Sequence, residues 1–354
     1  MKTLIIPAAG SSSRFPGMKP KWLLAHPQQD LMISKVLTKD LIKPYNKIYI
    51  TILQDHIKQY DALTILHQMF KERKLSNCEV VILDKPTSSA SETVLNTILQ
   101  KNIKGPITIK DSDCVVDFKN TLSSNFIVGL DINKYPITNP GSKSYLIKDE
   151  HNNIQDIIEK NVVSNYMCTG VYSLENSQDF ILGYNALKES NIFNNNEIYV
   201  SHVFSYLIQK QITNTEYIEC DNFIDWGTLQ DWRKEQEKYK TYIFDIDGVV
   251  VKNIGPYGTE TWYNSITPLK ENIKIIKQLS DKGNQIIFMT ARDEKGIKLI
   301  KQMLKENSIK YHKIITNCYH SQRIIVNDYA NTNPYPSCSS ISIKRNESLK
   351  PYLS

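Results

Sequence analysis

The chain has 354 residues, of which 41% are hydrophobic and 23% charged, and it carries a net charge of +6. Such a length predicts two domains, and the ordinary composition excludes a collagen-like or disordered chain. The basic residues are spread over the whole length rather than gathered in a stripe, and no run reaches the roughly 18 apolar residues of a membrane span, so we expect neither nucleic acid nor a membrane as partner.

The first nine residues form a short apolar stretch that Pro7 interrupts and a Gly/Ser loop follows at once. This pattern indicates a buried first strand rather than a targeting segment. The six cysteines form no CxxC pair and have no histidine at zinc-like spacing, which is typical of a reducing compartment. We therefore expect a cytoplasmic protein with free thiols.

Short β-branched runs alternate with apolar residues at helical spacing along the whole chain. We expect strands over 48–52, 79–83, 107–109, 285–289 and 324–326. Helical spacing marks residues 33–41 and 269–279, and Gly283 is placed to end the second of these helices. Alternation of this kind predicts an α/β fold twice over. A charged stretch over 232–240 reads as a last helix and linker, so the predicted domains are 1–236 and 237–354.

A loop of small residues follows the first strand, and basic residues follow the loop. Main-chain N–H groups in such a loop can approach phosphate oxygens, and Arg14 and Lys21 would supply positive charge there. Taken alone, the loop favours an ordinary turn before an exposed basic segment. The full string over 7–24 resembles the signature of sugar-nucleotidyltransferases with a GT-A-like Rossmannoid fold, of the cytidylyl and uridylyl type. The resemblance implies catalytic roles for Arg14 and Lys21 and nucleotide contacts from Ala8, Ala9, Gly10, Ser11, Ser12, Ser13, Arg14 and Lys21.

Other segments resemble the same family in the same order along the chain. Residues 86–93 are similar to its loop beside the base and ribose, which implies nucleotide contacts from Ser91, Glu92 and Thr93, although a capped helix start explains them equally well. The substrate-binding residues implied by the resemblance are Glu159 and Lys160, near the sugar phosphate, and Gly170, in the sugar pocket.

Two acidic segments resemble the metal ligands of that family. Asp111 and Asp113 follow a predicted strand, and two carboxylates this close repel each other unless a cation compensates, although a surface turn is the alternative. Asp225 begins a D-x-G-T motif that resembles the second metal ligand. The resemblance implies Mg²⁺ between Asp113 and Asp225, where a phosphorylated sugar or polyol would attack a nucleoside triphosphate and release pyrophosphate. CTP is favoured over UTP because the loop lacks the threonine-containing form, and the product would serve surface (capsular) polysaccharide.

Residues 242–249 resemble motif I of the haloacid dehalogenase (HAD) superfamily. That resemblance implies a Rossmannoid domain in which Asp245 is the nucleophile and Asp247 the general acid/base. It also implies phosphate contacts from Thr290 and Arg292, and Mg²⁺ ligation by Asp245, Asp247 and Asp328. The interval from 248 to 268 is too short for a cap, so the domain would be capless.

The second domain departs from the HAD pattern at two points. Residue 327 is Asn where many active members carry an acid, and no lysine stands before the expected strand, where His320 and Arg323 are the available cations. Three interpretations therefore remain open. The chain is a nucleotidyltransferase with a phosphomonoesterase domain, a nucleotidyltransferase whose HAD domain serves structure or oligomerisation, or a nucleotide-sugar sensor. A homo-oligomer is compatible with each of them.

Overall fold

The computed structural model divides into two compact units, Met1–Trp232 and Arg233–Ser354. It describes residues 1–119, 123–135, 137–190, 197–254, 261–328 and 337–353. Within these residues, no helix is both long enough and apolar enough to cross a bilayer.

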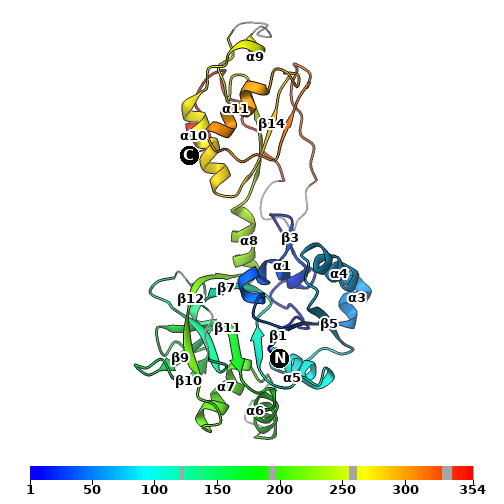
Figure 1. Cartoon of the computed structure of the whole chain (residues 1–354), viewed down its shortest axis with the longest axis vertical. Coiled ribbons are helices and arrows are strands. Elements are labelled where there is room, and N and C mark those ends of the chain that lie inside the picture. Colours follow the sequence, from blue (N-terminus) through cyan, green and yellow to red (C-terminus); the bar gives the residue numbers. More distant parts are fainter. Residues whose placement is uncertain (120–122, 136, 191–196, 255–260, 329–336, 354) are drawn as a thin grey trace. The chain divides into compact units, whose positions relative to one another are not determined.

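A mixed sheet of ten strands forms the centre of the first unit (Figure 1). Its main path is β5-β4-β1-β6-β11-β8-β12-β7, and β9 joins β10 to β11. The strands are β1 (Thr3–Pro7), β4 (Lys47–Leu53), β5 (Cys78–Leu83), β6 (Ile107–Lys110), β7 (Cys114–Phe118), β8 (Phe126–Asp131), β9 (Ser144–Lys148), β10 (Ile154–Glu159), β11 (Tyr166–Leu174) and β12 (Glu216–Asp225). The strands expected over 48–52, 79–83 and 107–109 are confirmed as β4, β5 and β6.

Helices cover both faces of this sheet, because its central strands alternate apolar side chains between the two faces. On β1, Ile5 packs into one hydrophobic cluster and Leu4 and Ile6 into another. The first cluster also holds α5, α6 and α7, which lie together in Figure 1. The helices are α1 (Met32–Val36), α2 (Lys39–Ile42), α3 (Gln54–Tyr60), α4 (Ala62–Glu72), α5 (Ala90–Gln100), α6 (Ser177–Ser190) and α7 (Val200–Gln209). The 3-10 turns η1 (Lys21–Leu23) and η2 (Pro140–Ser142) and the short strands β2 (Ala25–His26) and β3 (Asp30–Leu31) complete the unit, and α8 (Leu229–Glu237) spans the boundary at Trp232.

The second unit is built on three parallel strands in the order β13-β14-β15. Its elements are β13 (Thr241–Asp245), α9 (Thr261–Asn264), α10 (Lys270–Asp281), β14 (Gln285–Met289), α11 (Lys298–Glu306), β15 (Lys313–Ile315) and α12 (Lys350–Leu353). The predicted strand 285–289 and the predicted helix over 269–279 are confirmed. Gly283 has a φ of +84°, the left-handed conformation that commonly follows the end of a helix. Phe244, Ile276, Phe288 and Ile300 lie in the shared core.

The prediction of a strand over 324–326 was wrong. These residues have no regular secondary structure, and Ile324 and Val326 are 78% and 91% exposed. A β-branched run becomes a strand where a neighbour accepts its hydrogen bonds and one face is buried. In the described part of the second unit the sheet ends at β13 and β15, and this run joins neither.

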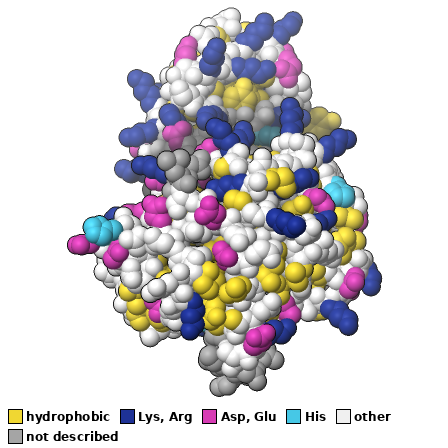
Figure 2. All heavy atoms as spheres, turned by 60° about the horizontal axis from the view of Figure 1, so that its bottom comes forward, with side chains coloured by type: hydrophobic (Ala, Val, Ile, Leu, Met, Phe, Trp, Pro, Cys, Tyr) yellow, Lys and Arg dark blue, Asp and Glu magenta, His cyan; other side chains and the backbone are white. Residues whose placement is uncertain are grey.

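Charged side chains of both signs are distributed over the surface. On the face drawn in Figure 2, Lys and Arg lie among Asp, Glu and apolar side chains.

Candidate active site

The small-residue loop and the acidic turn lie at the same edge of the large sheet. Strand β1 runs parallel to β6, and the loop over 8–13 follows β1 as the turn over 111–113 follows β6. The carboxyl ends of neighbouring parallel strands are where open α/β sheets bind ligands. Ala8 and Ala9 are buried, whereas Gly10, Ser11, Ser13 and Arg14 are exposed. The loop therefore presents its glycine, serine and arginine residues to solvent.

Strand β12 brings Asp225 to the same turn. It runs antiparallel to β7 with Asp225 opposite Cys114, and the Trp226 N–H donates to the carbonyl oxygen of Asp113 at 2.9 Å. A β-carbon placed on Gly227 would lie 3.0 Å from Asp225 Oδ1, 3.4 Å from Asp113 Oδ2 and 3.9 Å from Arg14 Nη1. Groups from three distant parts of the chain thus converge on one point.

Two lysines neutralise the converging carboxylates. Lys21 Nζ lies 2.5 Å from Asp113 Oδ2, and the ammonium of Lys143 pairs with Asp225 Oδ2. The main-chain N–H of Lys21 donates to Ser12 Oγ at 3.1 Å, which ties this lysine to the small-residue loop. Sequence reasoning missed Lys143, because no motif distinguishes it from an ordinary surface lysine.

A fully buried lysine supports the acidic turn from behind. Lys110 is 0% exposed, and its ammonium donates to the carbonyl oxygens of Asp111 and Cys114, each at 2.8 Å, and to Cys114 Sγ at 2.9 Å. These contacts satisfy a buried charge with three acceptors, and they fix the main chain on both sides of Asp113.

The two carboxyls of the turn differ in acidity. Burial, followed by repulsion from Asp113, raises the pKa of Asp111 to about 6. Burial also opposes ionisation of Asp113, but the charge and hydrogen bond of Lys21, with the charges of Lys110 and Lys143, outweigh it and lower the pKa of Asp113. Asp113 is therefore the carboxyl that the surrounding cations hold in its charged form.

The donor atoms at this turn fit a hard divalent cation. Among the described residues, Asp111, Asp113 and Cys114 form a group whose ligand atoms lie within 4.8 Å of one another. Cys114 Sγ accepts from Lys110 and donates to the Thr169 carbonyl, so the carboxylate oxygens are the donors left for an ion. Oxygen ligands of this kind are those that Mg²⁺ prefers.

Gly170 lies against Asp111. It stands at an irregularity in β11 with a φ of +79°, and the Asp111 N–H donates to its carbonyl oxygen at 2.9 Å. A β-carbon at this position would lie 2.3 Å from Asp111 Oδ2, closer than real contacts allow. The residue predicted to line a sugar pocket therefore makes room for the acidic turn.

Glu159 is the last residue of β10 and Lys160 follows it, and the two side chains have separate partners. Glu159 Oε2 accepts from Ser144 Oγ at 2.5 Å and from Ser201 Oγ at 2.6 Å. The ammonium of Lys160 donates to Tyr199 Oη and lies 4.3 Å from the centre of that ring. Their neighbourhood is joined to the acidic site because the Lys160 N–H donates to the Lys143 carbonyl at 2.9 Å.

The side chains at the start of α5 are used within the protein. Ser89 caps the helix by accepting from the Glu92 N–H at 3.2 Å, and Glu92 in turn accepts from Ser88. Ser91 donates to the Ile198 carbonyl and Thr93 contacts Thr87, and both side chains are buried. The capping interpretation thus accounts for these residues, and the exposed residues of this loop are 84–86 and Ser88.

The residues for which the sequence resemblance implied roles in the second unit assemble only in part. Both carboxylate oxygens of Asp247 accept from the buried guanidinium of Arg292, whose Nη2 lies 2.6 Å from Oδ1, and Thr290 Oγ1 lies 3.4 Å from Oδ2.

Asp245 is exposed at the end of β13. Desolvation raises its pKa, and the nearby Arg323 and His320 oppose the rise. Asp328 lies in the exposed segment that lacks the expected strand, and no three-acid cluster forms around Asp245 among the described residues.

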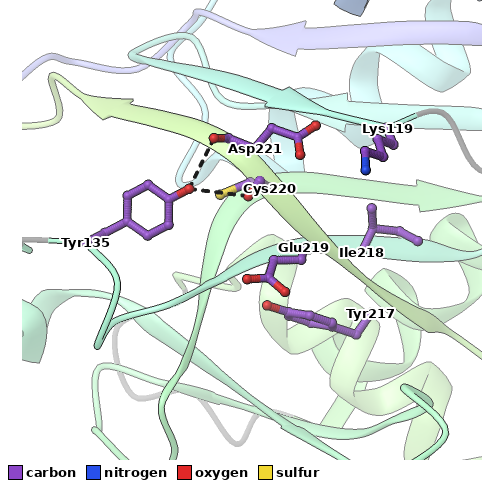
Figure 3. Close-up of a pocket in the computed structure, with 7 residues that line it drawn as sticks. All are labelled: Lys119, Tyr135, Tyr217, Ile218, Glu219, Cys220 and Asp221. Carbon is purple, nitrogen blue, oxygen red and sulfur yellow. Dashed lines mark hydrogen bonds between the residues drawn. The ribbon is translucent and has the colours of Figure 1, made fainter.

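A surface pocket of about 440 Å³ lies elsewhere in the first unit (Figure 3). Tyr135 Oη donates to the carbonyl oxygens of Cys220 and Asp221 at its rim, and Tyr217 and Glu219 line it from β12. Its lining includes none of the residues that sequence patterns single out, so it is separate from the acidic site.

Replacing Lys110 with methionine is expected to lower the free energy of unfolding by about 3 kcal/mol, because the carbonyls of Asp111 and Cys114 lose their donor and the acidic turn loses one of its compensating charges. Urea denaturation of the purified protein measures this. Lys47→Met is the control, since Lys47 Nζ lies 3.9 Å from Glu79 in an exposed pair and its loss should cost under about 0.5 kcal/mol. Equal losses for the two variants would contradict a supporting role for Lys110.

The sequence matches no family model and no curated protein, but the fold resembles solved structures. One is a nucleoside-diphosphate-sugar pyrophosphorylase from Vibrio cholerae RC9, with a TM-score of 0.57, 19% identity, and coverage of 66% of this chain and 99% of that chain. Another is the inositol-1-phosphate CTP transferase from T. maritima, with a TM-score of 0.50, 15% identity, and coverage of 65% and 90%.

An apo UDP-glucose pyrophosphorylase is similar as well, with a TM-score of 0.51, 16% identity, and coverage of 67% of this chain and 97% of that chain. The covered share, about two thirds, is also the share of the chain that the first unit takes up. The α/β sheet of this chain therefore has the fold of sugar-phosphate nucleotidyltransferases. At these identities the likeness is one of fold.

Proposed function

We propose that the first unit is a nucleotidyltransferase that joins the nucleotidyl group of a nucleoside triphosphate to a phosphorylated sugar or polyol and releases pyrophosphate. The observation that carries the proposal is the convergence of Asp113, Asp225 and Arg14 around Gly227. The fold likeness to two pyrophosphorylases and a CTP transferase supports it.

Each group at the site has a role in such a reaction. The exposed loop over 10–13 would place main-chain N–H groups and hydroxyls against the phosphates, and Arg14 and Lys21 would balance the charge of the departing pyrophosphate. Asp113 and Asp225 would hold Mg²⁺, which supplies positive charge beside the reacting phosphates when it is bound. The protein then acts by positioning and electrostatics, since phosphoryl-type transfer needs little covalent work from side chains.

For the substrates, we propose CTP ahead of UTP, and a product used in surface (capsular) polysaccharide. The preference for CTP over UTP rests on the loop sequence after Gly10, which lacks a threonine before Arg14. One similar structure is described as a CTP transferase, and another as UDP-glucose pyrophosphorylase, so both bases deserve the same test.

The deciding experiment is ³¹P NMR of the purified chain with Mg²⁺, each of the four nucleoside triphosphates in turn, and pooled sugar and polyol phosphates. The proposal expects pyrophosphate together with a new diphosphate ester, strongest with CTP. Binding of a nucleotide sugar without any turnover, over the whole panel, would instead favour a sensor.

For the second unit, we propose a HAD-like module that does not turn over phosphomonoesters and serves structure or oligomerisation. The supporting observation is that Arg292 and Thr290, the residues expected to meet phosphate, both contact Asp247. The oxygens of Asp247 are thereby taken by donors of the protein itself, and Asp328 stands in an exposed segment. In this proposal the contacts of Asp247 with Arg292 and Thr290 stabilise the fold of the second unit.

Wild type and Asp245→Asn are therefore expected to release phosphate at the same background rate from p-nitrophenyl phosphate and from sugar phosphates with Mg²⁺. A malachite green assay measures this, and Asp247→Asn should give the same rate. Phosphate release by the wild type that Asp245→Asn reduces by tenfold or more would contradict the proposal and restore the phosphomonoesterase interpretation.

A further inference from the structure

Lys143 connects the carboxylate of Asp225 with the segment that holds Glu159 and Lys160. It follows η2 and directly precedes β9, and its ammonium pairs with Asp225 Oδ2. The two side chains are 18% and 20% exposed, so the pair is shielded but open to solvent on one side.

The main chain around Lys143 contacts Glu159 and Lys160. Its carbonyl oxygen accepts from the Lys160 N–H at 2.9 Å, and the next residue, Ser144, donates to Glu159. Lys143 therefore has its ammonium on a proposed metal ligand and its backbone beside Glu159 and Lys160, the residues for which the sequence resemblance implies contacts with the sugar phosphate.

The Lys143 ammonium pairs with Asp225 Oδ2, whereas Asp225 Oδ1 is the oxygen that lies toward Asp113. An ion bound between the two acids and this ammonium would share the Asp225 carboxylate, and their positive charges would repel each other. Binding of an ion at Asp225 therefore favours release of the Lys143 ammonium. The backbone of Lys143 stays anchored to Lys160, so the released ammonium remains within reach of groups that lie between Asp225 and Lys160.

On the basis of the proposed function, we propose that Lys143 binds the phosphate group of the acceptor and holds Asp225 only until a divalent ion takes its place. A phosphate monoester is the anion that the proposed reaction brings to this point, and an ammonium is a common partner for it. Lys143 thus couples metal loading of Asp225 to acceptor binding.

The acceptor half of this proposal is tested by steady-state kinetics of Lys143→Met and Lys143→Arg with the substrates that ³¹P NMR identifies. Lys143→Met should raise the KM for the acceptor at least tenfold and change the KM for the nucleoside triphosphate less than twofold, and Lys143→Arg should recover part of the loss. Lys134→Met is the control, since Lys134 forms an exposed pair with Glu219, outside the site, and its loss should change neither constant. An unchanged acceptor KM in Lys143→Met would overturn the proposal.

The competition half is tested without substrates, by titrating each variant with Mn²⁺ and following free ion by electron paramagnetic resonance. Lys143→Met should bind Mn²⁺ several-fold more tightly than wild type, because the competing ammonium is gone. A lysine with only a structural role would leave the affinity unchanged or weaken it, and either result would overturn the proposal. Failure of the proposed function is distinguishable, because wild type would then form no diphosphate product with any nucleotide.

Discussion

Replacing Asp225 with asparagine is expected to lower kcat for pyrophosphate release by about two to three orders of magnitude while the fold is kept. Asparagine retains the shape of the side chain and can still accept from Lys143 and Gly227, which contact Asp225 in the wild type. It loses the negative charge that a divalent ion requires. Asp113→Asn should cause a loss of the same order, because both carboxylates face one point.

The double variant Asp113→Asn/Asp225→Asn sharpens this prediction. Two ligands of one ion act as a unit, so the double variant should be little slower than either single variant. Losses that multiply would indicate independent roles for the two acids.

Asp117→Asn is the matched control, because Asp117 lies on β7 and accepts from Asn222 of β12, on the same pair of strands. It should retain wild-type turnover in a coupled pyrophosphate assay. A kcat within threefold of wild type for Asp225→Asn would contradict the proposed role of the carboxylate pair.

Sequence patterns were sufficient for the elements that local chemistry determines. The β-branched runs that became β4 and β6 are buried on both faces, so hydrophobicity alone marks them. The run that became β5 lies at the edge of the sheet, and its buried side chains are Val81 and Leu83. The capped start of α5 followed from the serine and threonine residues that precede it, which are common N-cap residues, and Ser89 is the N-cap in the structure. The run over 324–326 has the same local character, but a strand also needs a free neighbouring edge, which no local pattern reports.

The contacts of the site depend on tertiary structure to different degrees. Asp113 and Asp225 are 112 positions apart, and only their resemblance to an ordered set of motifs suggested that they lie near each other. Lys143 belongs to no motif, and its pairing with Asp225 arises from the path of the chain between η2 and β9. The burial of Lys110 could not be predicted from the sequence either, because an isolated lysine at a strand end is usually exposed.

Substitution of Gly170 with alanine is expected to disturb the acidic turn directly. The new β-carbon would lie 2.3 Å from Asp111 Oδ2 and 2.7 Å from Asp111 Cγ, so the Asp111 side chain must move. The backbone there also has a φ of +79°, which alanine adopts at a cost of about 1–2 kcal/mol. Because Asp111 shares its turn with Asp113, we expect kcat for pyrophosphate release to fall about 10- to 100-fold.

Gly105→Ala separates the two effects of this substitution. Gly105 has a similar φ of +84°, but a β-carbon there would meet nothing within 4 Å. Both variants should therefore lose comparable stability from backbone strain in urea denaturation, with a further loss in Gly170→Ala from the clash. Only Gly170→Ala should lose turnover, because only its β-carbon reaches the acidic turn. Equal turnover in the two variants would mean that the position of Asp111 does not matter for the reaction, and the acidic turn would then have to act through Asp113 alone.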